Sequence, residues 1–195
     1  MAQFPNGMSV MEAINGRSSV RDYAPEKIDQ ATVIRLLAAA MRAPTAAHGE
    51  PWAFVIVQDA DILRRISVRA KEFFVREAHN ARLHAGNPVL ANFADPDFNV
   101  FYNAGTLIVI CADSTGPFVF ADCWLAAGNL MLAASAMGLG TCVIGSSVSA
   151  LNSSELKAEL GIPATVTAIA PIIVGVPAGE TPQTDRKEPQ ILVWK

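Results

Sequence analysis

Apolar and polar residues alternate along much of this chain with the spacing of amphipathic helices. After Asp29, a residue type that often caps a helix N-terminus, apolar side chains recur three and four positions apart until the turn before Pro44. The same spacing, with many charged residues interspersed, continues over residues 60–82. We therefore predict two long helices in these regions and a shorter helix over residues 8–16.

Continuous apolar runs predict the strands. Residues 53–57, 106–112 and 165–176 are apolar enough to be buried on both faces of a sheet, and residues 141–144 form a fourth, shorter run. Pro171 lies inside the third of these runs and has no N–H to donate to a neighbouring strand. We therefore expect it at a sheet edge or at a bulge.

Short-range signals describe two further segments. Asn152 and Glu155 have the spacing of a capping box, which predicts a helix over residues 153–160. Residues 84–103 are rich in turn-forming residues, including Asp95, and are expected to form a loop.

Residues 118–137 are apolar almost all round, and their length would allow them to cross a membrane. They include Asp122 and Asn129, however, and no Lys or Arg flanks them. We therefore predict a core helix packed on a partner chain, with no membrane contact. Helices interleaved with few strands indicate a layered α/β or α+β fold.

Composition favours one domain in an oligomer. The 195 residues are enough for a single domain over residues 1–195, with 51% apolar and only 17% charged residues. So little charge predicts that apolar surface is buried against another chain. A net charge of −3 without long runs of like charge argues against nucleic-acid binding. Three separated cysteines without a metal-ligand pattern predict buried thiols, no metal site and, with no signal peptide, a cytoplasmic protein.

Several catalytic motifs are absent or incomplete. Gly138-Leu139-Gly140 has two glycines of a dinucleotide fingerprint, but Val143 replaces the third and the segment follows a helix instead of a strand. The sequence contains neither an NTPase phosphate loop nor a GxSxG nucleophile motif. These absences fit a protein whose bound cofactor carries the reaction.

Residues 17–21 contain the groups that bind a phosphate. Arg17 and Arg21 supply guanidinium groups, and Ser18 and Ser19 supply hydroxyls. A second basic pair, Arg186-Lys187, follows in the proline-rich tail. Considered alone, these residues are better explained by a solvated basic turn and an exposed tail.

Five segments, in order, resemble the nitroreductase family, and together they span nearly the whole chain. They are Arg17–Arg21 with Asp22-Tyr23; the loop 43–52 ending in Pro51-Trp52; Phe101-Tyr102-Asn103-Ala104; residues 136–141 with Ile144-Gly145; and Val174-Gly175-Val176-Pro177 followed by Arg186. The resemblance implies an α+β fold with three α/β/α layers, a central mixed and mostly antiparallel sheet, and the long core helix at a dimer interface.

The resemblance also implies a function. Family members bind FMN at a homodimer interface and pass hydride from NAD(P)H to nitroaromatics, quinones or related acceptors by a ping-pong mechanism. Because the flavin carries the chemistry, no catalytic side chain is expected. The implied phosphate, ribityl and ring-edge contacts are Arg17, Ser18, Ser19, Arg21 and Arg186. The implied ring-lining residues are Pro44, Thr45, Ala46 and His48, from the partner subunit, with Ile144 and Gly145 presenting backbone to the ring.

Three positions depart from the family pattern. His48 stands where the family usually has Asn, Glu50 where it has Gln, and Gly105 where it has Pro. Other readings stay open at this point. The same scaffold serves azoline dehydrogenation, flavin destruction and dehalogenation, and a non-catalytic FMN-binding dimer or a dimer without cofactor is also compatible with the sequence.

Overall fold

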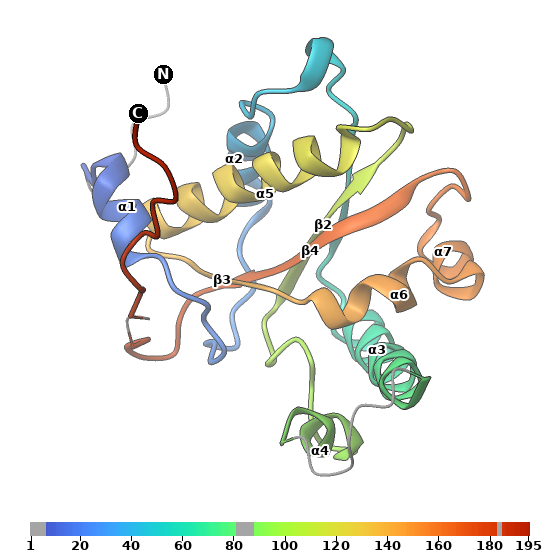
Figure 1. Ribbon diagram of the computed structural model, residues 1–195. Coiled ribbons are helices and arrows are strands. Elements are labelled where there is room, and N and C mark those ends of the chain that lie inside the picture. Colours follow the sequence, from blue (N-terminus) through green and yellow to red (C-terminus); the bar gives the residue numbers. More distant parts are fainter. Residues whose placement is uncertain (1–6, 81–87, 183–184) are drawn as a thin grey trace.

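A computed structural model describes residues 7–80, 88–182 and 185–195 of the chain (Figure 1). Within them the helices and strands follow the order α1 (Val10–Gly16), α2 (Gln30–Ala40), η1 (Ala46–His48), β1 (Trp52–Val57), α3 (Ala60–Asn80), α4 (Pro88–Ala94), β2 (Thr106–Ala112), α5 (Val119–Ala136), β3 (Gly140–Val143), η2 (Gly145–Ser147), α6 (Val148–Leu151), α7 (Ser154–Leu160) and β4 (Thr167–Gly175).

The strands form one sheet in the order β1-β2-β4-β3, and each neighbouring pair is antiparallel. All seven residues of β2 are buried, as expected for a strand covered on both faces. Ser19, which belongs to no strand, forms a parallel bridge with Thr141 and so joins the N-terminal segment to β3. The predicted α+β class is therefore confirmed.

Helices cover both faces of the sheet and make three layers (Figure 1). Successive β2 residues point to opposite faces, so Leu107 and Val109 pack with α3, α6 and α7, whereas Ile108 and Ile110 pack with α2 and α5. The two apolar cores thus lie on either side of one buried sheet. At the start of α2 the predicted Asp29 cap is present, since its carboxylate accepts a hydrogen bond from the Thr32 amide at 2.6 Å.

Pro171 lies in a central strand, so an edge position is wrong for this residue. The β2–β4 register shifts between Ile110 and Cys111, which leaves Ile169 as the extra residue of a bulge two positions before the proline. The Pro171 carbonyl accepts from the Ile144 amide at 2.9 Å. In an antiparallel sheet, the N and O atoms of one residue point toward the same neighbouring strand. The nitrogen of Pro171 therefore points toward β3, just beyond its last residue, where no strand hydrogen bond needs an N–H from β4.

Two local predictions are wrong. Residues 88–94 form helix α4 within the expected loop, while residues 84–87 lie outside the described residues. Tertiary packing explains the helix, because the Phe93 ring lies 4.0 Å from that of Phe74, centroid to centroid. The cap of α7 is Ser153, whose hydroxyl accepts from the Leu156 amide.

Asn152, the predicted capping residue, binds β4 instead of the helix. Its side-chain amide donates to the Ala168 carbonyl and its side-chain oxygen accepts from the Ala168 amide, each at 2.9 Å. Asn152 thereby attaches the α6–α7 connection to the sheet, a contact between residues distant in sequence that a local capping pattern does not reveal.

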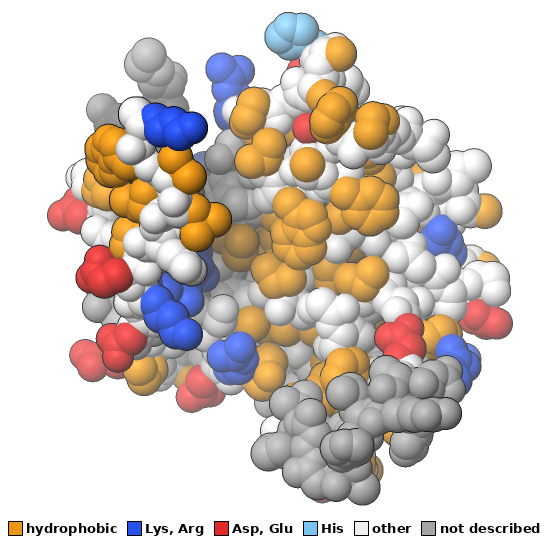
Figure 2. Space-filling view, in the orientation of Figure 1, with side chains coloured by type: hydrophobic (Ala, Val, Ile, Leu, Met, Phe, Trp, Pro, Cys, Tyr) orange, Lys and Arg blue, Asp and Glu red, His pale blue; other side chains and the backbone are white. Residues whose placement is uncertain are grey.

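Helix α5 is the central helix of one layer, as predicted. Val119–Ala136 is long and apolar enough to cross a membrane by composition, with a mean hydropathy of 1.4, and 39% of it is buried where it packs on α2, β2 and β4. Its outward side carries Phe120, Trp124 and Leu125, which are 44–59% exposed. Figure 2 shows apolar side chains gathered across the middle of this face of the molecule, where Figure 1 places α5.

Candidate functional site

The segment after α1 lies along the edge of the sheet beside β3. The Val20 amide donates to the Thr141 carbonyl at 3.0 Å, next to the bridge between Ser19 and Thr141. The chain approaches closely here because Gly140 has no side chain, since a Cβ at that position would lie 2.7–2.9 Å from Val20. Backbone pairing therefore places residues 17–21 against β3.

Arg17 and Arg186 line one cavity of about 450 Å³, although they are far apart in sequence. The rest of its lining comes from α1 and α5: Ile14, Asn15, Gly128, Met131 and Leu132. Figure 2 shows a hollow at the boundary between the α1 region and α5, with Lys and Arg side chains near it. Two guanidinium groups facing one cavity are suited to a phosphate, since each can donate two hydrogen bonds to its oxygens.

Arg21, Ile144 and Gly145 border a second, smaller hollow of about 100 Å³. Gly145 is exposed, and a Cβ built on it would meet nothing within 4 Å, so its backbone faces open space. The Arg21 guanidinium lies 5.9 Å from the centre of the Tyr102 ring, at the far limit of a cation–π contact. A flat ligand can therefore approach the backbone of residues 144–145 beside a cation.

The Cys142 thiol lies within the electrostatic influence of three of the predicted residues. Burial raises the pKa of Cys142, while Arg21, a hydrogen bond with Ser19, and Arg17 act in the opposite direction. Ser18 lies between Arg17 and Ser19 and is half-buried like both of them. All three cysteines, Cys111, Cys123 and Cys142, are free and buried, as predicted.

The loop with Pro44, Thr45, Ala46 and His48 lies elsewhere. The Ala46 amide donates to the carboxylate of Asp122, in the first turn of α5, at 3.3 Å from each oxygen. The Arg17 cavity meets α5 at Gly128, Met131 and Leu132, six to ten residues further on and therefore about 9–15 Å along the helix axis. Within one chain, the structure does not bring these four residues to Arg17 or Gly145.

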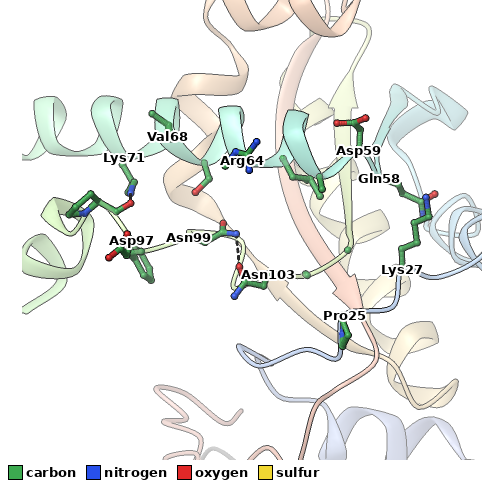
Figure 3. Close-up of a pocket in the computed structure, with 17 residues that line it drawn as sticks. Pro25, Lys27, Gln58, Asp59, Arg64, Val68, Lys71, Asp97, Asn99 and Asn103 are labelled. Carbon is green, nitrogen blue, oxygen red and sulfur yellow. Dashed lines mark hydrogen bonds between the residues drawn. The ribbon is translucent and has the colours of Figure 1, made fainter.

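A cavity larger than the two just described contains none of the predicted residues. It measures about 1070 Å³ and lies between α3 and residues 96–105 (Figure 3). Several of its polar groups already have partners: Lys71 donates to the carbonyls of Asp95 and Pro96, and the Asn99 side-chain amide donates to Asn103 at 3.0 Å. Cavity size and the sequence-predicted residues therefore point to different places on the molecule.

Sequence reasoning missed part of the smaller hollow. Phe93, Phe98 and Tyr102 line it, and their rings form a chain with centroid distances of 5.5 and 5.7 Å. Tyr102 and Asn103 adopt left-handed backbone angles, with φ of 50° and 59°. Asn is a residue that tolerates this conformation, so Asn103 was the available signal for a tight turn at this point.

Three comparisons with known proteins point to one family. The family model described as Nitroreductase family matches residues 14–176. A candidate NADH dehydrogenase/NAD(P)H nitroreductase of Archaeoglobus fulgidus is 29% identical over 175 residues, which cover 87% of this chain and 86% of that protein. An iodotyrosine deiodinase of Thermotoga neapolitana is 27% identical over 128 residues, 64% of this chain and 67% of the relative. The crystal structure of an FMN-bound nitroreductase from Bacteroides fragilis superposes with a TM-score of 0.81 at 23% identity, covering 96% of this chain and 100% of that one.

Proposed function

The chain belongs to the nitroreductase family of FMN-dependent oxidoreductases, and on that premise we propose that it is a cytoplasmic homodimer that transfers hydride from NAD(P)H to nitroaromatic, quinone or related acceptors. The observation that carries the proposal is the cavity shared by Arg17 and Arg186. It joins the first and last basic segments of the chain into one anion site, next to an edge of the sheet where backbone is open.

The donor set fits FMN. Arg17 and Arg186 would hold the phosphate, because two guanidinium groups match its charge and its oxygens. Ser18, Ser19 and Arg21 follow in order along β3 and would reach the ribityl chain and the polar edge of the ring. The open space over Gly145 leaves room for a ring to approach the backbone there.

When bound, FMN would supply the redox chemistry that links the nicotinamide donor to the acceptor. The residues of this chain bind and orient the partners of that reaction. Ile144 and Gly145 lie on the β3 side, so we propose that a single side stays open and that donor and acceptor occupy it in turn. The resulting kinetics are ping-pong.

A homodimer would complete the site. The outward side of α5 carries Phe120, Trp124 and Leu125, which no described part of the same chain covers fully. A twofold axis perpendicular to α5 would pack this side on its copy and reverse the direction of the second helix. The loop held by Asp122 at one end of α5 would then face the partner's Arg17 region at the other end.

Reductive dehalogenation of an iodinated phenol is the second candidate. The iodotyrosine deiodinase of Thermotoga neapolitana, 27% identical over 128 residues, favours it. This second candidate function would use the same cofactor site and would differ from the first in the acceptor. Turnover of 3-iodo-L-tyrosine, measured as released iodide, against turnover of a nitroaromatic and a quinone separates the two candidates.

The first experiment is to purify the protein without added flavin, record its visible spectrum and identify any chromophore released on denaturation. We expect FMN at one per chain. Initial rates with varied NAD(P)H and acceptor should then give parallel double-reciprocal lines, whereas intersecting lines would exclude the ping-pong scheme. A colourless protein that takes up no added FMN would overturn the proposed function.

A further inference from the structure

Asp122 is a buried acidic residue that the proposed flavin contacts do not include. Its residue exposure is 6%, and it lies within α5 among the apolar residues Val119, Cys123 and Ala126. A carboxylate removed from water is costly unless it accepts hydrogen bonds. Its position in the first turn of α5 favours negative charge, and both of its oxygens accept from the Ala46 amide at 3.3 Å.

The loop that receives this contact adopts a demanding backbone conformation. Ala47, His48 and Glu50 have φ values of 50°, 55° and 43°, in the left-handed region that residues with a Cβ seldom occupy. Such angles persist only where the surrounding structure enforces them. The loop therefore needs an anchor outside itself.

The other hydrogen bonds of the loop join residues that both belong to it. The Gly49 amide donates to the Ala46 carbonyl at 3.0 Å, and the Glu50 amide approaches the Thr45 hydroxyl at 3.4 Å. In the described part of the chain, Asp122 is the residue outside residues 44–50 that hydrogen-bonds to Ala46–Glu50. The side chains of the loop are otherwise half-buried or exposed.

We propose that Asp122 is a positioning residue for the flavin site, which fixes the loop through the Ala46 amide and so sets where His48 meets the ring. The inference rests on the proposed function, because Asp122 can position the flavin site only if the loop contacts the flavin. Asp122 touches neither cofactor nor substrate. It acts through the backbone of Ala46.

This role predicts different behaviour for two substitutions. Asp122→Asn keeps a side-chain oxygen that can accept from the Ala46 amide, whereas Asp122→Leu keeps the size of the side chain and removes the acceptor. A third variant, Ala46→Pro, removes the N–H from the loop side and leaves α5 unchanged. Thr45 before it is extended, with φ −133° and ψ 150°, which a following proline tolerates.

The test uses the full chain, with and without FMN. Without FMN, hydrogen exchange of a peptide covering residues 44–52 should be at least tenfold faster in Asp122→Leu and in Ala46→Pro than in wild type. With FMN, both variants should bind it at least tenfold more weakly and change the flavin reduction potential. Asp122→Asn should stay within about threefold of wild type in both measurements, because it retains the acceptor oxygen.

Asp29→Leu is the matched control, since it removes the N-cap of α2 without touching the loop. It should lower stability yet leave the potential and the exchange of residues 44–52 unchanged. Wild-type exchange and potential in both Asp122→Leu and Ala46→Pro would overturn the inference. A wild-type chain that takes up no FMN while Asp122→Leu still accelerates exchange would instead refute the function and retain the anchor.

Discussion

Replacing Arg17 with alanine tests the core of the proposed site. Arg17 is the residue that ends α1, where its backbone amide still donates to the Ala13 carbonyl at 3.1 Å. That bond uses backbone alone, so alanine preserves it. The side chain has no described ion pair and faces the cavity shared with Arg186. The substitution therefore removes a phosphate donor with little change to the fold.

The expected loss follows from one hydrogen-bonded charge. A hydrogen bond to a charged group contributes about 1.5–3 kcal/mol, which corresponds to a weakening of FMN binding by roughly 10- to 150-fold. Arg17 is half-buried whereas Arg186 is exposed. Within that range, the loss of FMN affinity should therefore be larger for Arg17→Ala than for Arg186→Ala. Because both residues would hold one phosphate, their effects should be coupled. The loss of FMN binding free energy in the double variant should therefore differ from the sum of the losses in the two single variants.

The assay is a fluorescence titration of apoprotein with FMN at two salt concentrations. Lys187→Ala is the matched control, since it removes a charge next to Arg186 from a residue that does not line the cavity. Unchanged FMN affinity in Arg17→Ala, or an equal loss in Lys187→Ala, would remove Arg17 from the site and reduce the effect to general charge attraction.

Three further predictions concern other parts of the molecule. Gly145→Ala should leave the melting temperature of the apoprotein unchanged but weaken FMN binding, whereas Gly175→Ala, whose Cβ would lie 2.8 Å from a tyrosine ring atom, should cost about 1–3 kcal/mol in urea unfolding; equal effects on both quantities would contradict this contrast. Burial raises the pKa of Cys111 to about 12 and that of Cys123 to about 11. As the pH rises, these thiols therefore lose their protons in the unfolded chain before they do so in the folded chain. The free energy of unfolding should consequently fall between about pH 9 and 11 by roughly 1.4 kcal/mol per pH unit for each thiol. A free energy of unfolding that stays constant over this range, measured by urea titration at several pH values, would refute this prediction. Trp124→Glu should shift the proposed dimer to monomer in analytical ultracentrifugation, and a dimer that persists in the variant would place the interface elsewhere.

Patterns that act over a few residues predicted most of the fold. The apolar run 106–112 became the fully buried β2, and Asp29 caps α2. The local signals failed where a distant partner competes. Asn152 binds Ala168 on β4 and does not cap α7, and α4 is stabilised by aromatic rings from α3 and the segment after it.

The site was predictable to the extent that its residues follow one another along the chain. Ser19 was placed by a motif, and the structure sets it against β3. That Arg186 shares a cavity with Arg17 could be expected only from the family resemblance, since nothing in the tail indicates where it returns. The contact between Asp122 and Ala46 joins residues 76 positions apart, and no local pattern reports such a pair.

The separation of the two residue groups along α5 has a genetic consequence. If each site takes its phosphate cation from one chain and its ring-lining loop from the other, Arg17→Ala and a loop variant damage different halves of it. A mixed dimer then has one doubly damaged site and one intact site. Since half of randomly mixed dimers are mixed, two such variants, assayed at an FMN concentration too low to fill the sites of either alone, should regain about one quarter of wild-type activity after they are unfolded and refolded together. Two alleles that each encode an inactive protein would therefore complement each other in one cell.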